Sequence, residues 1–336
     1  MAEKLYLILP CYNEEEILER SAEKVRDMLC TLIRDEKAPL SGESRILFVD
    51  DGSKDRTWDI IASLHEKDTL FSGLKLAKNY GHQTAIFAGM EEALKEGADC
   101  MVTIDADLQQ DINALPEFLE KYRAGADIVY GIRDSRDTDG FFKKTTATLY
   151  YKLMNTLGVR IIPQSADYRL MSERAVKALS EYKEHNLFIR GLVPEIGFKS
   201  DSVYFHVSRR EAGSSKYTLK KMLTLALDGI TSFSIQPLRL VFMFGILAFI
   251  VSIIMMGLTI YDHIRGVTVP GWSTLTISIW LLGGVQLLSL GILGEYIGRT
   301  YMESKRRPRY FVSSVLGRGS SASDGASGSG ESGDRG

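Results

Sequence analysis

Three oxygen-bearing side chains occupy alternate positions in the segment DADLQ, namely Asp105, Asp107 and Gln109. The β-rich run at 101–105 leads directly into this segment, so the three residues stand at the end of a predicted strand. Because alternate residues of an extended segment point the same way, we expect these side chains to converge. Such oxygen ligands suit Mg²⁺ or Mn²⁺, which complete their coordination with water and substrate phosphate. An isolated D-x-D is usually a solvated turn, but this one lies in register with two other polar strand ends.

Polar side chains also follow the strands predicted at 5–10 and 45–50. The first strand ends in PCYNE, where proline ends the ladder and Asn13 is placed to cap the next helix; a plain helix cap is the alternative interpretation. The second strand ends in Asp50 and Asp51, which a tight turn follows. Neither strand is followed by G-x-G-x-x-G, so no pyrophosphate cradle of the dehydrogenase type is encoded. Carboxylates at these ends suit ribose hydroxyls and the polar edge of a base.

The elements that must position these groups alternate along residues 1–130. Short β-rich runs and helical patterns follow one another, which is typical of an α/β domain with a mostly parallel sheet covered by helices. In such sheets ligands bind in the crevice at the carboxyl ends of the strands. The predicted strands are 5–10, 45–50, 74–77, 101–105 and 127–131, and the main predicted helices are 14–29, 57–64 and 84–95.

Two long uncharged runs follow nearer the C-terminus. Residues 240–261 contain no charged side chain, and as a helix they would extend roughly 33 Å, enough for a bilayer core of about 30 Å. A second uncharged run covers 266–294. We expect two transmembrane helices, at about 238–261 and 273–296. Two buried core helices of a large soluble domain are the alternative, although buried helices are usually shorter.

Basic residues flank these runs on their outer sides, whereas the loop between them carries only His263 and Arg265 against Asp262. Because cytoplasmic flanks are enriched in Lys and Arg, both termini and the N-terminal domain are predicted to be cytosolic. The N-terminus also lacks the basic start and longer apolar stretch of a signal peptide. The flanking basic residues are Lys216, Lys220, Lys221 and Arg239 before the first run, and Arg299, Lys305, Arg306, Arg307 and Arg309 after the second.

These patterns divide the chain into five parts. Residues 1–215 form the cytosolic domain, and 236–300 hold the two membrane helices. Between them, 216–235 carries an apolar stripe that indicates an amphipathic helix in the membrane interface, with a packed surface helix of the cytosolic domain as the alternative. A basic cytosolic segment, 301–316, follows the second membrane helix. The Gly- and Ser-rich tail, 317–336, is too poor in apolar groups to order itself.

Composition excludes several classes of function. The 336 residues carry 41 Lys and Arg against 43 Asp and Glu, a net charge of −2, so no overall basic field indicates nucleic-acid binding. The three cysteines have no C-x-x-C spacing, which is typical of a reducing compartment and indicates neither a disulfide framework nor a zinc site.

Seven segments, in order along the chain, resemble a known family over about residues 4–310. They resemble the inverting family 2 glycosyltransferases of GT-A fold, and among these the bacterial polyprenyl-phosphate glycosyltransferases. The resemblance implies a Rossmann-like GT-A catalytic domain with interfacial helices, in a multi-pass protein of the bacterial plasma membrane. The segments are PCYNE, VDDGSKDRT, DADLQ, SADYRLMS, NLFIRGLVPEIGF, RREAGSSKY and KKMLTLALDGITSFSIQPLR.

The resemblance implies inverting transfer of a hexose from a nucleotide diphosphate sugar to undecaprenyl phosphate at the cytosolic membrane face. UDP-glucose is the first expectation for the donor and UDP-N-acetylglucosamine the next; a GDP-mannose-dependent mannose synthase is an alternative. A non-catalytic nucleotide-sugar-binding scaffold is an alternative of another class. A processive polysaccharide synthase is disfavoured because no tryptophan stands in a Q-x-x-R-W segment. Relatives also imply a homo-oligomer, and the pathway implies a flippase partner.

The resemblance also assigns roles to individual residues. His82, in NYGHQTA, is interpreted as a helix-start residue and not as a ligand, and an ion pair with Arg169 is the alternative role of Asp167. Val207 stands where the family often carries a further arginine. The expected catalytic residues are Asp107 and Asp167; the nucleotide-sugar site comprises Pro10, Tyr12, Asn13, Glu14, Asp51 and Asp105; the lipid-phosphate or diphosphate contacts are Arg133, Arg190, Arg210 and Lys216; and the metal ligands are Asp105, Asp107 and Gln109.

Overall fold

The structure is a computed structural model of the full chain. It describes residues 2–35, 39–133, 162, 165–184, 188–206, 238, 241–247, 250, 251, 254, 261, 265 and 271–317. The expected amphipathic helix at 216–235, Arg210, Lys216 and the tail from residue 318 onward therefore lie outside the described residues.

The described residues build an eight-stranded mixed sheet with the order β7-β5-β6-β4-β1-β2-β3-β8. Six strands run in the same direction, while β6 and β8 run antiparallel to their neighbours. This confirms the predicted α/β class with a mostly parallel sheet. The strands are β1 (Leu5–Cys11), β2 (Arg45–Asp50), β3 (Phe71–Leu76), β4 (Cys100–Thr103), β5 (Ile128–Arg133), β6 (Ser165–Ser172), β7 (Ser200–Phe205) and β8 (Val312–Leu316).

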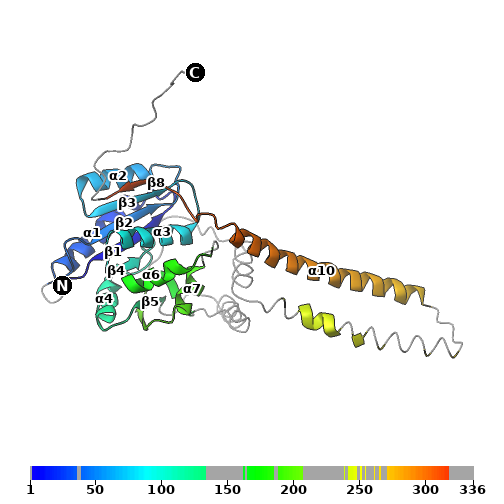
Figure 1. Ribbon diagram of the computed structural model, residues 1–336. Helices are drawn as coiled ribbons and strands as arrows, with labels where there is room; N and C mark the ends of the chain where they lie inside the picture. The colour runs from blue at the N-terminus through cyan, green and yellow to red at the C-terminus, as the bar shows by residue number, and fades with distance from the viewer. Residues whose placement is uncertain are drawn as a thin grey trace, which may run out of the picture.

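Helices cover both faces of the sheet, so the domain has three layers (Figure 1). Alternate residues of β1 point to opposite faces, since Leu5, Leu7 and Leu9 join one core and Tyr6 and Ile8 join the other. One core includes residues of α1 (Leu18–Ile33), α2 (Thr57–Lys67) and α4 (Leu115–Arg123), which follows the 3₁₀ turn η1 (Ile112–Ala114). The other includes residues of α3 (His82–Lys95), α6 (Glu173–Glu181) and α7 (Ile189–Glu195).

Some predicted boundaries at the first strand end are wrong. The helix expected from residue 14 begins at Leu18, where the N-cap residue Ile17 makes no side-chain capping bond. The strand expected to stop at Pro10 continues to Cys11, because Pro10 keeps its place opposite Val49 in the parallel register. The longer strand moves the polar loop further out from the sheet edge.

The C-terminal part of the chain returns to the sheet, which the sequence analysis did not anticipate. The segment 301–316 begins as the end of helix α10 (Trp272–Ser304) and closes as β8, which pairs antiparallel with β3. Basic residues do occur in this segment, at Lys305, Arg306, Arg307 and Arg309. It is therefore a structural part of the N-terminal domain as well as a basic segment.

Helix α10 contains the second predicted membrane helix, 273–296, and projects away from the sheet (Figure 1). Its 33 residues correspond to roughly 50 Å of helix. Large apolar side chains along it are exposed, among them Ile279, Leu287 and Leu290. Within the described residues, no helix combines the length and the continuous apolarity that a membrane span requires. Residues 241–247 of the first predicted membrane helix are helical.

Candidate functional site

The loop after β2 is tied to the loop after β3 at the carboxyl edge of the sheet. The Oδ1 and Oδ2 atoms of Asp51 accept hydrogen bonds from the backbone N–H groups of Tyr80 (2.7 Å) and Gly81 (2.9 Å). Burial raises the pKa of Asp51, against the lowering effect of these two bonds. Gly52 has φ 67°, and a Cβ atom at that position would lie 2.4 Å from the carbonyl carbon of Lys78. The two loops therefore meet too closely for a side chain at position 52.

The loop after β1 is tied to the β2 loop through Asn13. Its Oδ1 accepts from the N–H of Lys54 at 2.9 Å, and its own N–H donates to the Ser53 hydroxyl at 3.0 Å. The N–H of Glu14 donates to the hydroxyl of Thr57 at 3.0 Å. The alternative interpretation of Asn13 as a plain cap of the next helix is therefore wrong, because its side chain holds the neighbouring loop. A left-handed backbone at Asn13, φ 54°, turns the chain at this point.

The DADLQ segment turns instead of remaining extended. The N–H of Leu108 donates to the carbonyl of Asp105 at 3.0 Å, and Leu108 has a left-handed backbone with φ 46°. The alternation from which convergence was expected therefore does not hold. Gln110, which the sequence analysis passed over, holds Asp105 instead: its Nε2 donates to Oδ2 at 2.5 Å, and its Oε1 accepts the Asp105 N–H at 2.8 Å.

The electrostatics of Asp105 fit a cation at this position. Burial raises the pKa of Asp105, and the charges of Asp167 and Asp107 raise it further, against the lowering effect of His82. A cation beside Asp105 and Asp107 would relieve this repulsion. Within the described part of the chain, no group of three or more His, Cys, Asp or Glu side chains is arranged to hold a metal ion. Mg²⁺ and Mn²⁺ need only one or two carboxylates when water and substrate phosphate supply the remaining ligands, so the donor set fits.

Asp167, on β6, is the most heavily bonded carboxylate of the site. Arg190 donates to it twice, from Nε to Oδ1 at 2.9 Å and from Nη2 to Oδ2 at 2.8 Å. Arg169 donates from Nη2 to Oδ1 at 3.0 Å, and Gln83 from Nε2 to Oδ2 at 3.1 Å. Burial alone would raise the pKa of Asp167, but the charges and hydrogen bonds of Arg190, His82 and Arg169 hold it well below its usual range. The alternative ion pair with Arg169 exists, and Arg190 joins it.

His82 connects the two carboxylate centres, which the sequence analysis did not expect. It is the first residue of α3, and its Nε2 lies 3.5 Å from Oδ1 of Asp105 and 3.6 Å from Oδ2 of Asp167. Burial lowers the pKa of His82, but the bond to Asp167 and the charge of Asp105 outweigh burial and raise it. The signal was present in the sequence, because NYGHQ follows the third strand at the same sheet edge as the other motifs.

The remaining expected site residues are spread around this edge. Pro10 is buried within β1, while Tyr12 is exposed on the loop that follows. Arg133 is the exposed last residue of β5. Gln109 follows Asp107, to whose Oδ1 its backbone N–H donates at 3.3 Å. The structure thus brings Asp105, Asp167 and Arg190 into one network.

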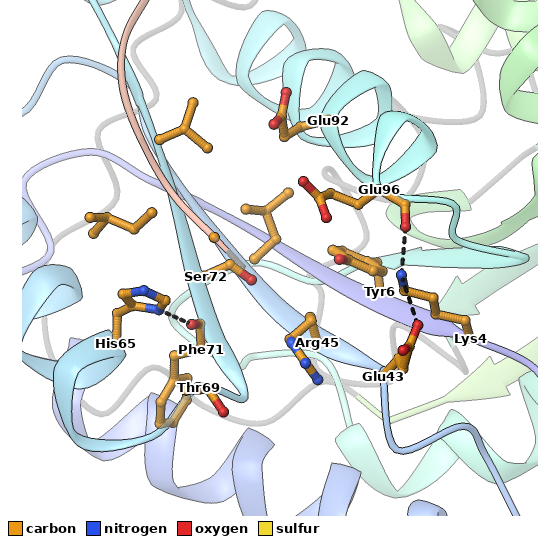
Figure 2. A pocket seen from close by; sticks show the side chains of 14 residues that line it. Lys4, Tyr6, Glu43, Arg45, His65, Thr69, Phe71, Ser72, Glu92 and Glu96 are labelled. Atoms are coloured by element: carbon orange, nitrogen blue, oxygen red, sulfur yellow. Dashed lines mark hydrogen bonds and ion pairs between the residues drawn. The ribbon is translucent and has the colours of Figure 1, made fainter. Parts of the chain in front are cut away.

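A pocket of about 240 Å³ lies at the opposite, amino edge of the sheet (Figure 2). It is lined by Tyr6 and Arg45 near the starts of β1 and β2, and by Glu92 and Glu96 at the end of α3. None of the expected site residues lines this pocket. The polar network at the carboxyl edge is therefore the candidate functional site.

Comparisons with known proteins give the family of this chain, whose mixed, mostly parallel sheet carries polar loops at its carboxyl edge. The model of glycosyl transferase family 2 matches residues 6–180, and a model described as the GtrB C-terminal hairpin matches residues 236–300. The chain belongs to glycosyltransferase family 2, and it is an enzyme of that class.

Similar proteins match along nearly the whole chain. The uncharacterized glycosyltransferase YkoT of Bacillus subtilis (strain 168) is 48% identical over 308 residues, covering 92% of this chain and 90% of that protein. The bactoprenol glucosyl transferase of Shigella phage SfV is 40% identical, covering 92% and 98%. Among solved structures, the mannosyltransferase PcManGT from Pyrobaculum calidifontis, in complex with GDP-Man and Mn²⁺, matches with a TM-score of 0.46 and 12% identity, over 69% of this chain and 64% of that chain.

Proposed function

We propose that this protein transfers glucose from UDP-glucose to undecaprenyl (bactoprenol) phosphate at the cytosolic face of the bacterial plasma membrane, with inversion at the anomeric carbon. The observation that carries the proposal is the network in which His82 lies between Asp105 and Asp167, in a chain similar to bactoprenol glucosyl transferases over 92% of its length. The product would be a polyprenyl-phosphate sugar for glycosylation of the cell envelope.

The chemistry of the acceptor explains why the site is rich in charges and why the reaction needs no general base. An oxygen of the lipid phosphate attacks the anomeric carbon, the bond from that carbon to the diphosphate oxygen breaks, and the nucleoside diphosphate leaves. Because the lipid phosphate is already an anion at neutral pH, no side chain has to take a proton from it. The task of the site is to hold two anions together and to stabilise the leaving group.

Asp107 and Asp167 remain the candidate catalytic carboxylates in this proposal. Two arginines hold the pKa of Asp167 low, so this carboxylate is a weak base. It is suited instead to fixing the guanidinium of Arg190 at the place where the phosphates would meet. Asp107 would act at the departing diphosphate.

Asp105 and Asp107, with Gln109 beside them, would hold Mg²⁺ or Mn²⁺. When bound, such an ion supplies a Lewis acid that neutralises charge developing on the diphosphate. Gln110 orients Asp105 for this role through two hydrogen bonds.

The other expected residues take roles that follow from their positions. The loops after β1 and β2, which carry Tyr12, Asn13, Glu14 and Asp51, would receive the nucleoside above Pro10. Arg133 at the end of β5, with Arg210 and Lys216 further along the chain, would contact the phosphates of donor and lipid.

The hairpin at 236–300 would enter the bilayer, with residues 1–215 and both termini in the cytosol. Its exposed apolar side chains, such as Leu282, Leu287 and Ile297, would contact lipid. The segment 216–235 would lie in the interface, near the lipid phosphate, and 301–316 would carry basic charge at the membrane surface. A homo-oligomer and a flippase that moves the product across the membrane are the proposed partners.

A transfer assay tests the proposal. Full-length protein in liposomes that contain undecaprenyl phosphate is given radiolabelled UDP-glucose, and label is followed into the chloroform-extractable lipid with Mg²⁺, with Mn²⁺ and with EDTA. We expect metal-dependent transfer with the opposite anomeric configuration. UDP-N-acetylglucosamine and GDP-mannose are run in parallel, and a preference for either would overturn the choice of glucose. Absence of transfer from every donor would overturn the enzymatic proposal.

A further inference from the structure

The chain that leaves helix α10 returns at once to the catalytic domain. We define the return segment as residues 309–316. Its strand β8 pairs antiparallel with β3, with Val315 opposite Leu74 and Ser314 opposite Lys75. The N–H of Ala77 donates to the carbonyl of Phe311 at 2.9 Å, which extends the pairing beyond β3. The return segment thus reaches the loop that leads from β3 into the functional site.

Arg309 attaches the start of the return segment to two elements at once. Its Nε donates to the carbonyl of Glu184 at 2.9 Å, and its Nη2 donates to the carbonyl of Tyr182, both just after α6. Its guanidinium lies 4.7 Å from the ring centroid of Phe87, on α3. Burial lowers the pKa of Arg309, against the charges of Glu91 and Glu184. A partly buried arginine with these partners is held in one orientation.

Tyr310 makes a second attachment to α3. Its hydroxyl donates to Oε2 of Glu91 at 2.5 Å, and its ring packs against the core on that face of the sheet. Burial and the bond to Glu91 both raise the pKa of Tyr310. Phe87 and Glu91 are four residues apart on α3, so Arg309 and Tyr310 contact the same helix face.

Helix α3 begins inside the functional site. Its first residue, His82, contacts Asp105 and Asp167, and its second, Gln83, donates to Asp167. From Glu91 to His82 the helix is roughly 14 Å long, and a helix transmits a displacement over such a length as a rigid rod. The return segment therefore contacts the middle and the C-terminal half of a helix whose first residue belongs to the site.

We propose that the return segment fixes the position of the membrane hairpin relative to the active site, and that it does so through α3. Arg309 and Tyr310 are the positioning residues. This inference rests on the proposed function, because the position of the active site relative to the membrane matters only when one substrate is a membrane lipid. The polyprenyl phosphate reaches the enzyme at a depth that the bilayer determines, so the site must be held at a matching height and angle. A misplacement of about 1 Å can cost about a hundredfold in rate, even when its cause lies far from the chemistry.

The test compares a membrane acceptor with a soluble one. Full-length Arg309→Ala is assayed in liposomes with undecaprenyl phosphate, and separately with a short, water-soluble isoprenyl phosphate. We expect kcat/KM for the membrane acceptor to fall about tenfold, while the value for the soluble acceptor and the KM for UDP-glucose stay within about twofold. Arg307→Ala, which removes the same charge from an exposed position two residues earlier, is the matched control and is expected to behave as wild type.

Tyr310→Phe provides a milder variant that keeps the ring in the core and removes only the bond to Glu91. We expect a smaller loss in the same direction, confined to the membrane acceptor. Glu91→Gln, alone and combined with Tyr310→Phe, completes a double-mutant cycle, and the combined loss is expected to be less than the sum. If kcat/KM fell equally for both acceptors, Tyr310 would only stabilise the fold, and this result would contradict the inference.

Hydrogen exchange gives a readout that does not depend on catalysis. We expect the backbone amides of 87–95, the part of α3 that Arg309 and Tyr310 contact, to exchange faster in Arg309→Ala than in Arg307→Ala, since the attachment of α3 is weakened in the first variant only. Equal exchange in the two variants would contradict the inference, whether or not the protein transfers sugar. A wild-type protein that transfers sugar to neither acceptor would contradict the proposed function. The exchange result would still show whether the return segment holds α3 in place.

Discussion

Among single residues, His82 links the two carboxylate centres of the site. It is the contact shared by Asp105 and Asp167, which stand at the ends of different strands. Without the imidazole these two carboxylates would face each other across a partly buried space, and each raises the energy of the other's charged form. The residue is therefore expected to matter for catalysis more than for folding.

We predict that His82→Ala lowers kcat about 10- to 100-fold, because Asp105 loses the positive neighbour that links it to Asp167 where charge develops. His82→Gln, which retains an N–H donor without the charge, should lose less. Steady-state kinetics with UDP-glucose and undecaprenyl phosphate measure both. His65→Ala is the control, since Nδ1 of this histidine pairs with the carbonyl oxygen of Phe71, which accepts, at the amino edge of the sheet, away from the site. An equal loss in the two alanine variants would contradict the prediction.

We also predict that Asp107→Ala lowers transfer by about 100- to 1000-fold, because the leaving diphosphate loses the carboxylate that would hold its counter-ion. Membrane insertion should be unchanged, and titration with Mn²⁺ should show a weaker apparent affinity. Asp59→Ala, an exposed acid in the first turn of α2, is the control. Residual activity near wild type would refute the metal assignment.

Among elements, the loops at the carboxyl edge behave as one assembly and not as three separate motifs. Asn13 joins the β1 loop to the β2 loop, and Asp51 joins the β2 loop to the β3 loop. Asp105 and His82 then connect β4 to α3. The order of the sheet, β4-β1-β2-β3, makes this possible because it places the four strand ends side by side.

Because these loops lie so close together, replacing one glycine between them is expected to destabilise the fold. Gly52→Ala would place a Cβ atom against the backbone of Lys78 and Asn79 in a left-handed conformation, so we expect it to lower the free energy of unfolding by about 1–3 kcal/mol. Gly42→Ala is the matched control, since nothing lies within 4 Å of the position where its Cβ would stand. Thermal unfolding of the two variants measures the difference, and equal midpoints would show that the loops are free to separate.

For the whole molecule, the division between the catalytic domain and the hairpin is the main feature. The domain buries its apolar side chains in two cores, whereas α10 exposes its own over much of its length. The near-balanced charge of the chain is therefore an average over two unlike parts.

We predict that Leu290→Arg weakens membrane insertion of the hairpin, since a charge near the centre of a membrane helix costs about 2.5–3.5 kcal/mol on insertion scales. Extraction of membranes with alkaline carbonate should release more of this variant than of wild type. Leu290→Ile is the control and should remain in the membrane. Equal extraction of Leu290→Arg and wild type would place this part of α10 outside the bilayer core.

Much of the central sheet and of the site could be predicted from local patterns. The runs at 5–10 and 45–50 predict β1 and β2, because buried parallel strands are continuously apolar. The motifs predict Asp105, Asp107 and Asp167 as site residues, and the structure joins Asp105 and Asp167 through His82. By contrast, the sequence patterns did not predict β6 and β8. Each of these strands pairs antiparallel with a strand far away in the sequence, β6 with β4 and β8 with β3.

The sequence by itself determined the family, the α/β class and the residue types that the chemistry needs, because local periodicity and short motifs encode these directly. Only the tertiary structure decided that DADLQ turns, that Arg190 and Arg169 share Asp167, and that His82 lies between two carboxylates. Only the structure shows that residues 312–316 form a strand paired with β3. The physical reason is that these contacts join groups far apart in the chain, and their geometry depends on packing that no short segment specifies.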